Sequence, residues 1–296
     1  MPHAFALALL HAGATVSLSG FSVHWSTVIG LALFVALYVW RARQGLGAGG
    51  SAAADPTVAP LGRTKPTLFA IGVVVMFLSL NGPLHDLSDS FLFSAHMLQH
   101  LLLAFVVAPL FIMGTPGWML RPALEWRGVR PTVAWLVRPT HAFAIFTVVF
   151  AGWHLPVAYN TAMAHHNIHI VMHLTMLAAS VIMWWPILSP LPELPRLSYP
   201  GQMLYLFLLT LPMMLISVYI AYADTVLYPA YASAPRIWGI SPMNDQLIGA
   251  LIMWIPGSFY FFTIISVVFF RWQQRDGNET VAGAQVNWVP DAAARP

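Results

Sequence analysis

The sequence predicts an all-α fold: a polytopic membrane protein built as a bundle of seven transmembrane helices. Of its 296 residues, 58% are hydrophobic and only 8% are charged, whereas a soluble domain carries about 25% charged residues. Several apolar runs of at least about 18 residues follow one another, as expected for helices that cross a bilayer. Such long runs differ from the short alternating segments of a β-barrel.

The apolar runs divide the chain into a membrane domain, residues 23–270, and two flanking segments. Residues 1–22 lack the basic start of a secretory signal and are expected to form an exoplasmic N-terminal segment. Residues 271–296 are polar and are expected to form a disordered cytoplasmic tail. The seven expected spans are residues 23–40, 67–84, 91–113, 140–159, 167–188, 201–222 and 246–270.

The distribution of basic residues predicts the orientation of the bundle. With the N-terminus outside and the C-terminus in the cytoplasm, twelve of the 13 Lys and Arg residues fall on inside segments and only Arg236 falls outside. This asymmetry is what the positive-inside rule requires. The net charge of +3 therefore reflects loop arginines, and we expect no nucleic-acid partner.

The composition limits the chemistry that the chain can perform. There are no cysteines, which excludes thiolate metal sites, disulfides and cysteine nucleophiles. Soft metal ligands must come from the 14 Met residues and borderline ligands from the 12 His residues. No Ser-His-Asp spacing or glycine-rich phosphate loop is present, and we do not expect an enzyme.

Two histidine pairs dominate the apolar runs. His96 and His100 lie four residues apart near the start of the third span, and His169 and His173 repeat this spacing near the start of the fifth. Residues at this spacing share one helix face. Because both spans run inward from the outer surface, the pairs are expected to meet at the same depth and hold a metal. Polar side chains in a membrane span are costly and usually functional, although hydrogen bonding between helices is an alternative.

Other side chains on the same side of the membrane could complete the site. Candidate thioether ligands adjoin the pairs, with core packing as the alternative role: Met97, Met172 and Met176. Secondary candidates are His85, His154, His165, His166, Asp224 and Asp245. Asp245 is expected either to orient a histidine or to serve as a helix N-cap.

The ligand set favours copper as Cu(I), because imidazole and thioether together suit that ion. The alternative is a haem-binding membrane oxidoreductase with bis-His ligation between helices three and five. A metal transporter is disfavoured, since polar groups would have to continue to the inner face, where only His141 is found.

Several blocks of sequence resemble the CtaG-type cytochrome c oxidase assembly factors. They are F-S-A-H-M-L-Q-H-L-L-L (93–103) with A-P-L-F-I-M-G-T-P (108–116), W-H-L-P (153–156), I-H-I-V-M-H-L (168–174) with W-W-P-I-L (184–188), A-Y-A-D-T-V-L-Y-P (221–229) and D-Q-L-I-G-A-L-I-M-W-I-P-G (245–257). One departure is Met172, which stands where such proteins often have an acidic residue.

The resemblance implies seven spans in the bacterial inner (plasma) membrane and a role in maturing the respiratory oxidase. It implies that copper insertion into the oxidase catalytic subunit is supported, with copper coming from an exoplasmic donor. The expected function is therefore a membrane assembly factor that binds Cu(I) at an exoplasmic-side His/Met site, with the lipid bilayer and the oxidase as partners.

Overall fold

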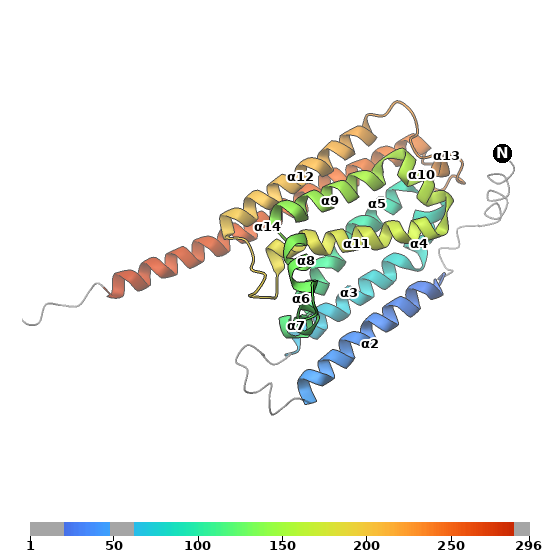
Figure 1. Cartoon of the computed structure of the whole chain (residues 1–296). Helices are drawn as coiled ribbons and strands as arrows, with labels where there is room; N and C mark the ends of the chain where they lie inside the picture. The colour runs from blue at the N-terminus through green and yellow to red at the C-terminus, as the bar shows by residue number, and fades with distance from the viewer. Residues whose placement is uncertain (1–20, 48–61, 287–296) are drawn as a thin grey trace, which may run out of the picture.

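The computed structural model describes residues 21–47 and 62–286, and within these ranges the chain is helical, with no strand (Figure 1). The helices are α2 (Trp25–Gly47), α3 (Thr64–Leu80), α4 (Pro83–Ser90), α5 (Phe93–Leu101), the π-helix η2 (Leu102–Val107), α6 (Ala108–Gly114), α7 (Gly117–Leu124), α8 (Val129–Leu136), α9 (Pro139–His154), α10 (Pro156–Ala164), α11 (His166–Leu188), α12 (Tyr199–Ala221), α13 (Pro229–Ala232) and α14 (Pro242–Val286). Most of the expected N-terminal segment, residues 1–20, lies outside the described residues.

The helices support a multi-pass membrane protein. Among the described residues, five helical stretches are long and apolar enough to cross a membrane: Trp25–Gly45, Phe93–Gly114, His166–Leu188, Tyr199–Ala221 and Pro242–Asp276. Two bent pairs raise the number to seven if each pair is one span: α3 with α4, bent by 44°, and α8 with α9, bent by 73°. The all-helical class is therefore confirmed, while seven spans and the orientation stay predictions.

Two proline positions correct the predicted span boundaries. The second span was expected to end at residue 84, but α3 ends at Leu80 and a new helix begins at Pro83. Likewise α9 ends at His154, and Pro156 starts α10. Proline disfavours helical backbone in the residue before it and is well suited to a first helical turn. Each proline therefore starts a separate short helix at the end of the bundle where the histidines lie.

The C-terminal part also differs from expectation. The last span was expected to end at residue 270 with a disordered tail, but α14 continues as one helix to Val286. It projects beyond the other helices in Figure 1. The residues after 270 are polar, yet Gln, Arg and Glu are good helix formers, and the helix has no proline beyond Pro256.

The core lies between the helices of the second half of the chain and α5. α12 packs against α14, α9 against α11, and α14 against α5, while α2 lies at the edge against α3 and α7 (Figure 1). Large buried side chains fill the interior, among them Trp184, Phe146, Phe261 and Met183.

A close approach positions the start of α5 against α14. A Cβ on Gly249 would lie 2.5 Å from the Phe93 ring, so only glycine permits this packing. Nearby, the buried carboxylate of Asp245 accepts hydrogen bonds from the backbone N–H groups of Phe93 (2.7 Å) and Ser94 (3.1 Å) and from the Ser94 hydroxyl (2.5 Å). Asp245 thus caps the N-terminus of a neighbouring helix and satisfies donors that the helix itself leaves free.

A wide helical turn follows the first histidine pair. In η2 the N–H of Ala108 bonds to the carbonyl of Leu103, five residues back. Two carbonyls of this turn accept hydrogen bonds from other helices: Ala104 from the indole of Trp184 (2.8 Å) and Phe105 from the hydroxyl of Tyr260. Such π-turns often occur at functional sites.

Candidate metal site

The two histidine pairs meet between α5 and α11. Across the two helices, the ring centroids of His96 lie 5.5 Å from His173 and 5.4 Å from His169, and that of His100 lies 5.2 Å from His173. Within each pair the two Nε2 atoms are 2.9 Å apart. The predicted meeting of the pairs is therefore seen in the structure, because i,i+4 spacing places each pair on one face.

The arrangement is compact enough for shared coordination. In the part of the chain that the structure describes, His96, His169 and His173 form a group whose ligand nitrogens all lie within 4.8 Å of one another. His96 and His169 are buried and His173 is partly buried. Imidazole nitrogen is a ligand for copper, zinc and iron, so this group can hold a transition metal.

Tyr231 fixes the proton on the His96 ring. Its hydroxyl lies 2.7 Å from the carbonyl oxygen of Ser88, which cannot donate, so the tyrosine proton is used there. The same oxygen lies 2.9 Å from the Tyr159 hydroxyl and 3.2 Å from His96 Nδ1, and it must accept from both. His96 therefore carries its proton on Nδ1, and the lone pair of Nε2 faces the cluster.

Asp89 acts on His169 in the same sense. Its Oδ1 lies 3.2 Å from His169 Nδ1, although the two atoms do not form a hydrogen bond. The negative charge of the carboxylate favours a proton on the nitrogen that faces it. The Nε2 atom of His169 is then an acceptor directed at His173. Carboxylate–histidine pairs of this kind orient metal ligands in many proteins.

The deeper histidine of each pair has one nitrogen without a partner. Because Nε2 of His96 and of His169 accept, Nε2 of His100 and of His173 donate within their pairs at 2.9 Å. Their Nδ1 atoms are buried and make no hydrogen bond. Buried polar atoms without partners are rare, and here two of them lie in one cluster of neutral rings. The lone pairs of these two Nδ1 atoms are therefore available to a ligand.

His154 adds a further nitrogen to this region. Its Nδ1 donates to the carbonyl of Phe150 at 2.6 Å, so Nε2 holds the lone pair, and that atom is buried without a partner. The His154 ring lies 5.8 Å from the His100 ring. The structure thus brings His154 next to the four central histidines.

The other secondary candidates take no part in the hydrogen bonds within the cluster, although His85 lies near enough to His169 and His173 to interact with both electrostatically. His85 has its Nδ1 bonded to the side-chain amide of Gln99 (3.1 Å), which also donates to the Ser79 carbonyl (2.7 Å). His85 Nδ1 is therefore an acceptor of that bond and is not free. His165, His166 and Asp224 are exposed. Asp245 caps α5, as described above, and makes no contact with a histidine among the bonds described for it.

The three methionines are buried, but none is joined to a histidine. Met97 approaches Gly249, and Met97 and Met176 belong to the main hydrophobic cluster. Met172 is fully buried in α11. Among the described residues, no hydrogen bond links the sulfur of any of the three to a ring nitrogen. Their part as ligands stays a prediction.

Sequence reasoning missed Asp89, Tyr231 and Met163. Asp89 lies at the end of the short helix α4, and Tyr231 lies in α13, far from the histidines in sequence. The sulfur of Met163 lies 3.9 Å from the Tyr231 hydroxyl, which itself lies 3.2 Å from His96 Nδ1. The aromatic residues in the polar connection 223–245 were the one feature of the sequence that could have indicated a contact between this connection and the histidines.

The bundle and its buried histidine cluster define a class: a multi-pass helical membrane protein with a metal-competent site between two of its helices. The family model of the cytochrome c oxidase caa3 assembly factor (Caa3_CtaG) matches residues 31–275. The chain belongs to this family, as the sequence resemblance implied.

Curated relatives are more distant. The chain is 24% identical over 203 residues to uncharacterized protein Mb0105 of Mycobacterium bovis and, equally, to uncharacterized protein MT0111 of Mycobacterium tuberculosis. Each match covers 63% of this chain and 31% of the relative, so the chain spans about a third of the length of these relatives. No solved structure matches the chain.

Proposed function

We propose that this assembly factor binds Cu(I) as cargo at the histidine cluster and supports copper insertion into the oxidase catalytic subunit. One observation carries the proposal: the ligand nitrogens of His96, His169 and His173 converge within 4.8 Å inside an apolar bundle. His100 adds a nitrogen 2.9 Å from His96. Membership in an oxidase assembly family names the oxidase and the membrane as the setting.

The chemistry of the cluster supports a monovalent soft cation. A charge in a low-dielectric interior is costly unless it is compensated, and Cu(I) brings only one positive charge. The carboxylate of Asp89 lies 3.2 Å from His169 and offsets that charge. Neutral imidazoles supply the ligands that copper accepts. Copper can be passed on only if its coordination shell in the site is incomplete. The additional histidines nearby offer replacement ligands while the ion is transferred.

The distribution of basic residues supports an exoplasmic position for the cluster. The starts of α5 and α11 share one end of the bundle with α4, α10 and α13 (Figure 1). Arg41, Arg121, Arg138 and Arg196 lie at helix ends or connections of the opposite side. In a bacterial inner membrane the histidine end would face an exoplasmic copper donor. Delivery of cargo requires no turnover, which fits a non-enzymatic role.

Metal analysis of protein purified under reducing conditions tests the proposal. Wild-type protein is expected to retain Cu(I) stoichiometrically, and His100→Ala or His173→Ala is expected to abolish high-affinity binding. His166→Ala is the matched control, because it removes an exposed histidine from the same helix as His173. Normal copper content in both cluster variants, with helicity unchanged, would refute the site. Cells lacking the protein should contain oxidase deficient in active-site copper.

The distances between the histidine rings do not favour haem ligation between the third and fifth spans, which are α5 and α11 in the structure. The rings of α5 and α11 already pack at centroid distances of 5.2 to 5.5 Å, whereas a haem macrocycle must lie between its two axial imidazoles. A Soret band in the purified protein would decide for haem and against the copper proposal.

A further inference from the structure

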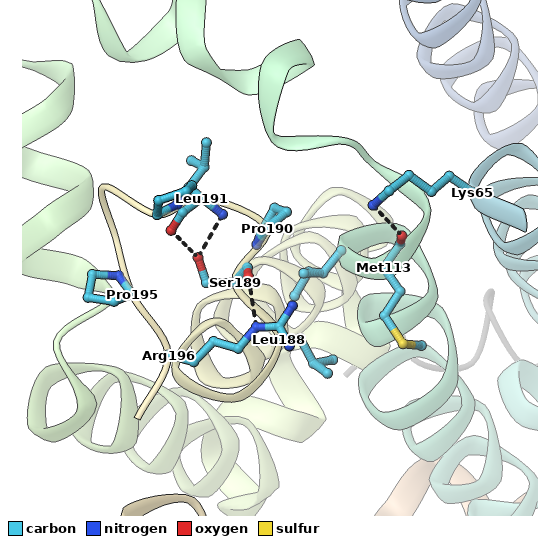
Figure 2. Close-up of a pocket in the computed structure, with 10 residues that line it drawn as sticks. Lys65, Met113, Leu188, Ser189, Pro190, Leu191, Pro195 and Arg196 are labelled. Carbon is cyan, nitrogen blue, oxygen red and sulfur yellow. Dashed lines mark hydrogen bonds between the residues drawn. The ribbon is translucent and has the colours of Figure 1, made fainter. Parts of the chain in front are cut away.

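A second candidate site lies at the end of the bundle opposite the histidines. A cavity of about 540 Å³ opens between the start of α3, the end of α6 and the connection after α11. Figure 2 shows Lys65 and Arg196 on different sides of this space, with Ser189 next to Arg196. Nothing in the proposed copper chemistry uses this cavity.

Two positive charges line the cavity, and no carboxylate among the described residues pairs with either of them. Lys65 Nζ donates to the carbonyl of Met113 at 3.5 Å, and Arg196 Nε donates to the carbonyl of Ser189 at 2.9 Å (Figure 2). Both acceptors are neutral. The acidic residue of the connection, Glu193, pairs with Arg121 at 2.8 Å instead. Lys65 and Arg196 repel each other electrostatically, so an anion between them would be stabilised.

The remaining walls are apolar and rigid. They consist of Ile112, Met113, Leu188 and Leu191 together with the prolines 190, 192 and 195. Proline fixes one backbone dihedral, which limits the conformations of this connection. The Ser189 hydroxyl further binds both the N–H and the carbonyl of Leu191 at 3.2 Å. A small hydrated anion needs no such walls, whereas an amphiphile does.

The position along the helices fits a lipid. The cavity lies where α3 begins and where the stretches Phe93–Gly114 and His166–Leu188 end. The ends of membrane spans are at the depth of lipid headgroups, and basic pockets between such helices recognise anionic headgroups. Arg and Lys bind phosphate oxygens through charge-assisted hydrogen bonds.

We propose that this cavity binds the phosphate of an anionic phospholipid between Lys65 and Arg196, with the glycerol and upper acyl chain against the proline and leucine walls. The lipid would link the start of α3 to the end of α11, the helix that carries His169 and His173.

Native mass spectrometry tests the proposal on full-length protein in nanodiscs of phosphatidylcholine with or without phosphatidylglycerol. The wild type is expected to retain phosphatidylglycerol selectively. Removing both charges, with Lys65→Gln and Arg196→Gln, is expected to reduce that selectivity roughly 30-fold, since each cation near a membrane surface contributes about fivefold. The control, Arg127→Gln with Arg138→Gln, removes two exposed charges outside the cavity. Unchanged selectivity in the cavity variant, or an equal loss in the control, would overturn the proposal.

The chain offers a second readout, because Lys65 is its one lysine. Acylation of this amine by an amine-specific reagent, followed by peptide mass spectrometry, is expected to slow several-fold when phosphatidylglycerol replaces part of the phosphatidylcholine. Inorganic phosphate added to phosphatidylcholine nanodiscs should leave the rate unchanged. Equal protection by inorganic phosphate would show a free-anion site and overturn the lipid assignment.

Discussion

Replacing Tyr231 with phenylalanine tests whether the proton on His96 is set from outside the cluster. The substitution removes one oxygen and leaves the ring in place. Besides the Met163 sulfur at 3.9 Å, three oxygen or nitrogen partners are hydrogen-bonded to that oxygen: the Ser88 carbonyl at 2.7 Å, the Tyr159 hydroxyl at 2.9 Å and His96 Nδ1 at 3.2 Å. Without it, His96 is free to carry its proton on Nε2, the atom that faces the other histidines.

The bonds in the structure allow the size of both effects to be worked out. Each hydrogen bond contributes about 0.5–1.5 kcal/mol, and buried groups left unpaired add to the cost. The loss of three buried bonds should lower the free energy of unfolding by about 2–4 kcal/mol. Removing a group that orients a metal ligand costs about 10–100-fold in affinity, so the Kd for Cu(I) should rise by that factor.

The assay is competition for Cu(I) against a chromophoric chelator, with stability measured separately by denaturant unfolding and circular dichroism. Tyr205→Phe is the matched control: this buried tyrosine makes one hydrogen bond, to the Met183 carbonyl at 3.0 Å, away from the cluster. It should lose about 1 kcal/mol of stability and keep its copper affinity. Destabilised Tyr231→Phe protein with wild-type affinity would refute the reasoning, as would an equal affinity loss in both variants.

Two further substitutions test other parts of the site. Asp89→Asn should weaken Cu(I) binding about tenfold, because a neutral amide no longer favours the proton on His169 Nδ1. Chelator competition measures the Kd, and Asp224→Asn, at an exposed carboxylate, is the control. An unchanged Kd in Asp89→Asn would contradict this role. Asp245→Ala should reduce the free energy of unfolding by about 2–3 kcal/mol, since three hydrogen bonds to a buried carboxylate are lost at the start of α5. In urea or detergent unfolding, a change below about 0.5 kcal/mol would show that the cap is dispensable.

The sequence alone was sufficient to predict the histidine contact. Each pair lies on one face of its helix, and the two spans run in the same direction, so the pairs lie at the same depth and can contact each other. The helical class followed as directly from long apolar runs with few charges. The spacing within each span and the shared direction of the two spans can both be read from a single sequence.

The groups that tune the cluster could not be predicted in this way. Tyr231 reaches His96 because the connection between α12 and α14 folds back over the bundle, and Asp89 reaches His169 because α4 bends away from α3 by 44°. Both contacts join segments whose relative position is decided by tertiary packing. The role of Asp245 could likewise be predicted only in part. Aspartate is a common helix cap, but the helix that Asp245 caps lies about 150 residues earlier in the sequence.

The wide turn of η2 has a consequence for how the first histidine pair is aimed. A turn with bonds to the fifth residue back holds one residue more than a regular turn, so deleting a residue there would rotate the two halves of the helix relative to each other by about 100°. Trp184 and Tyr260 donate hydrogen bonds to the carbonyls of Ala104 and Phe105 and thereby stabilise the wide turn with its additional residue. The direction of His96 and His100 is thus set partly by an indole and a phenol that never touch them.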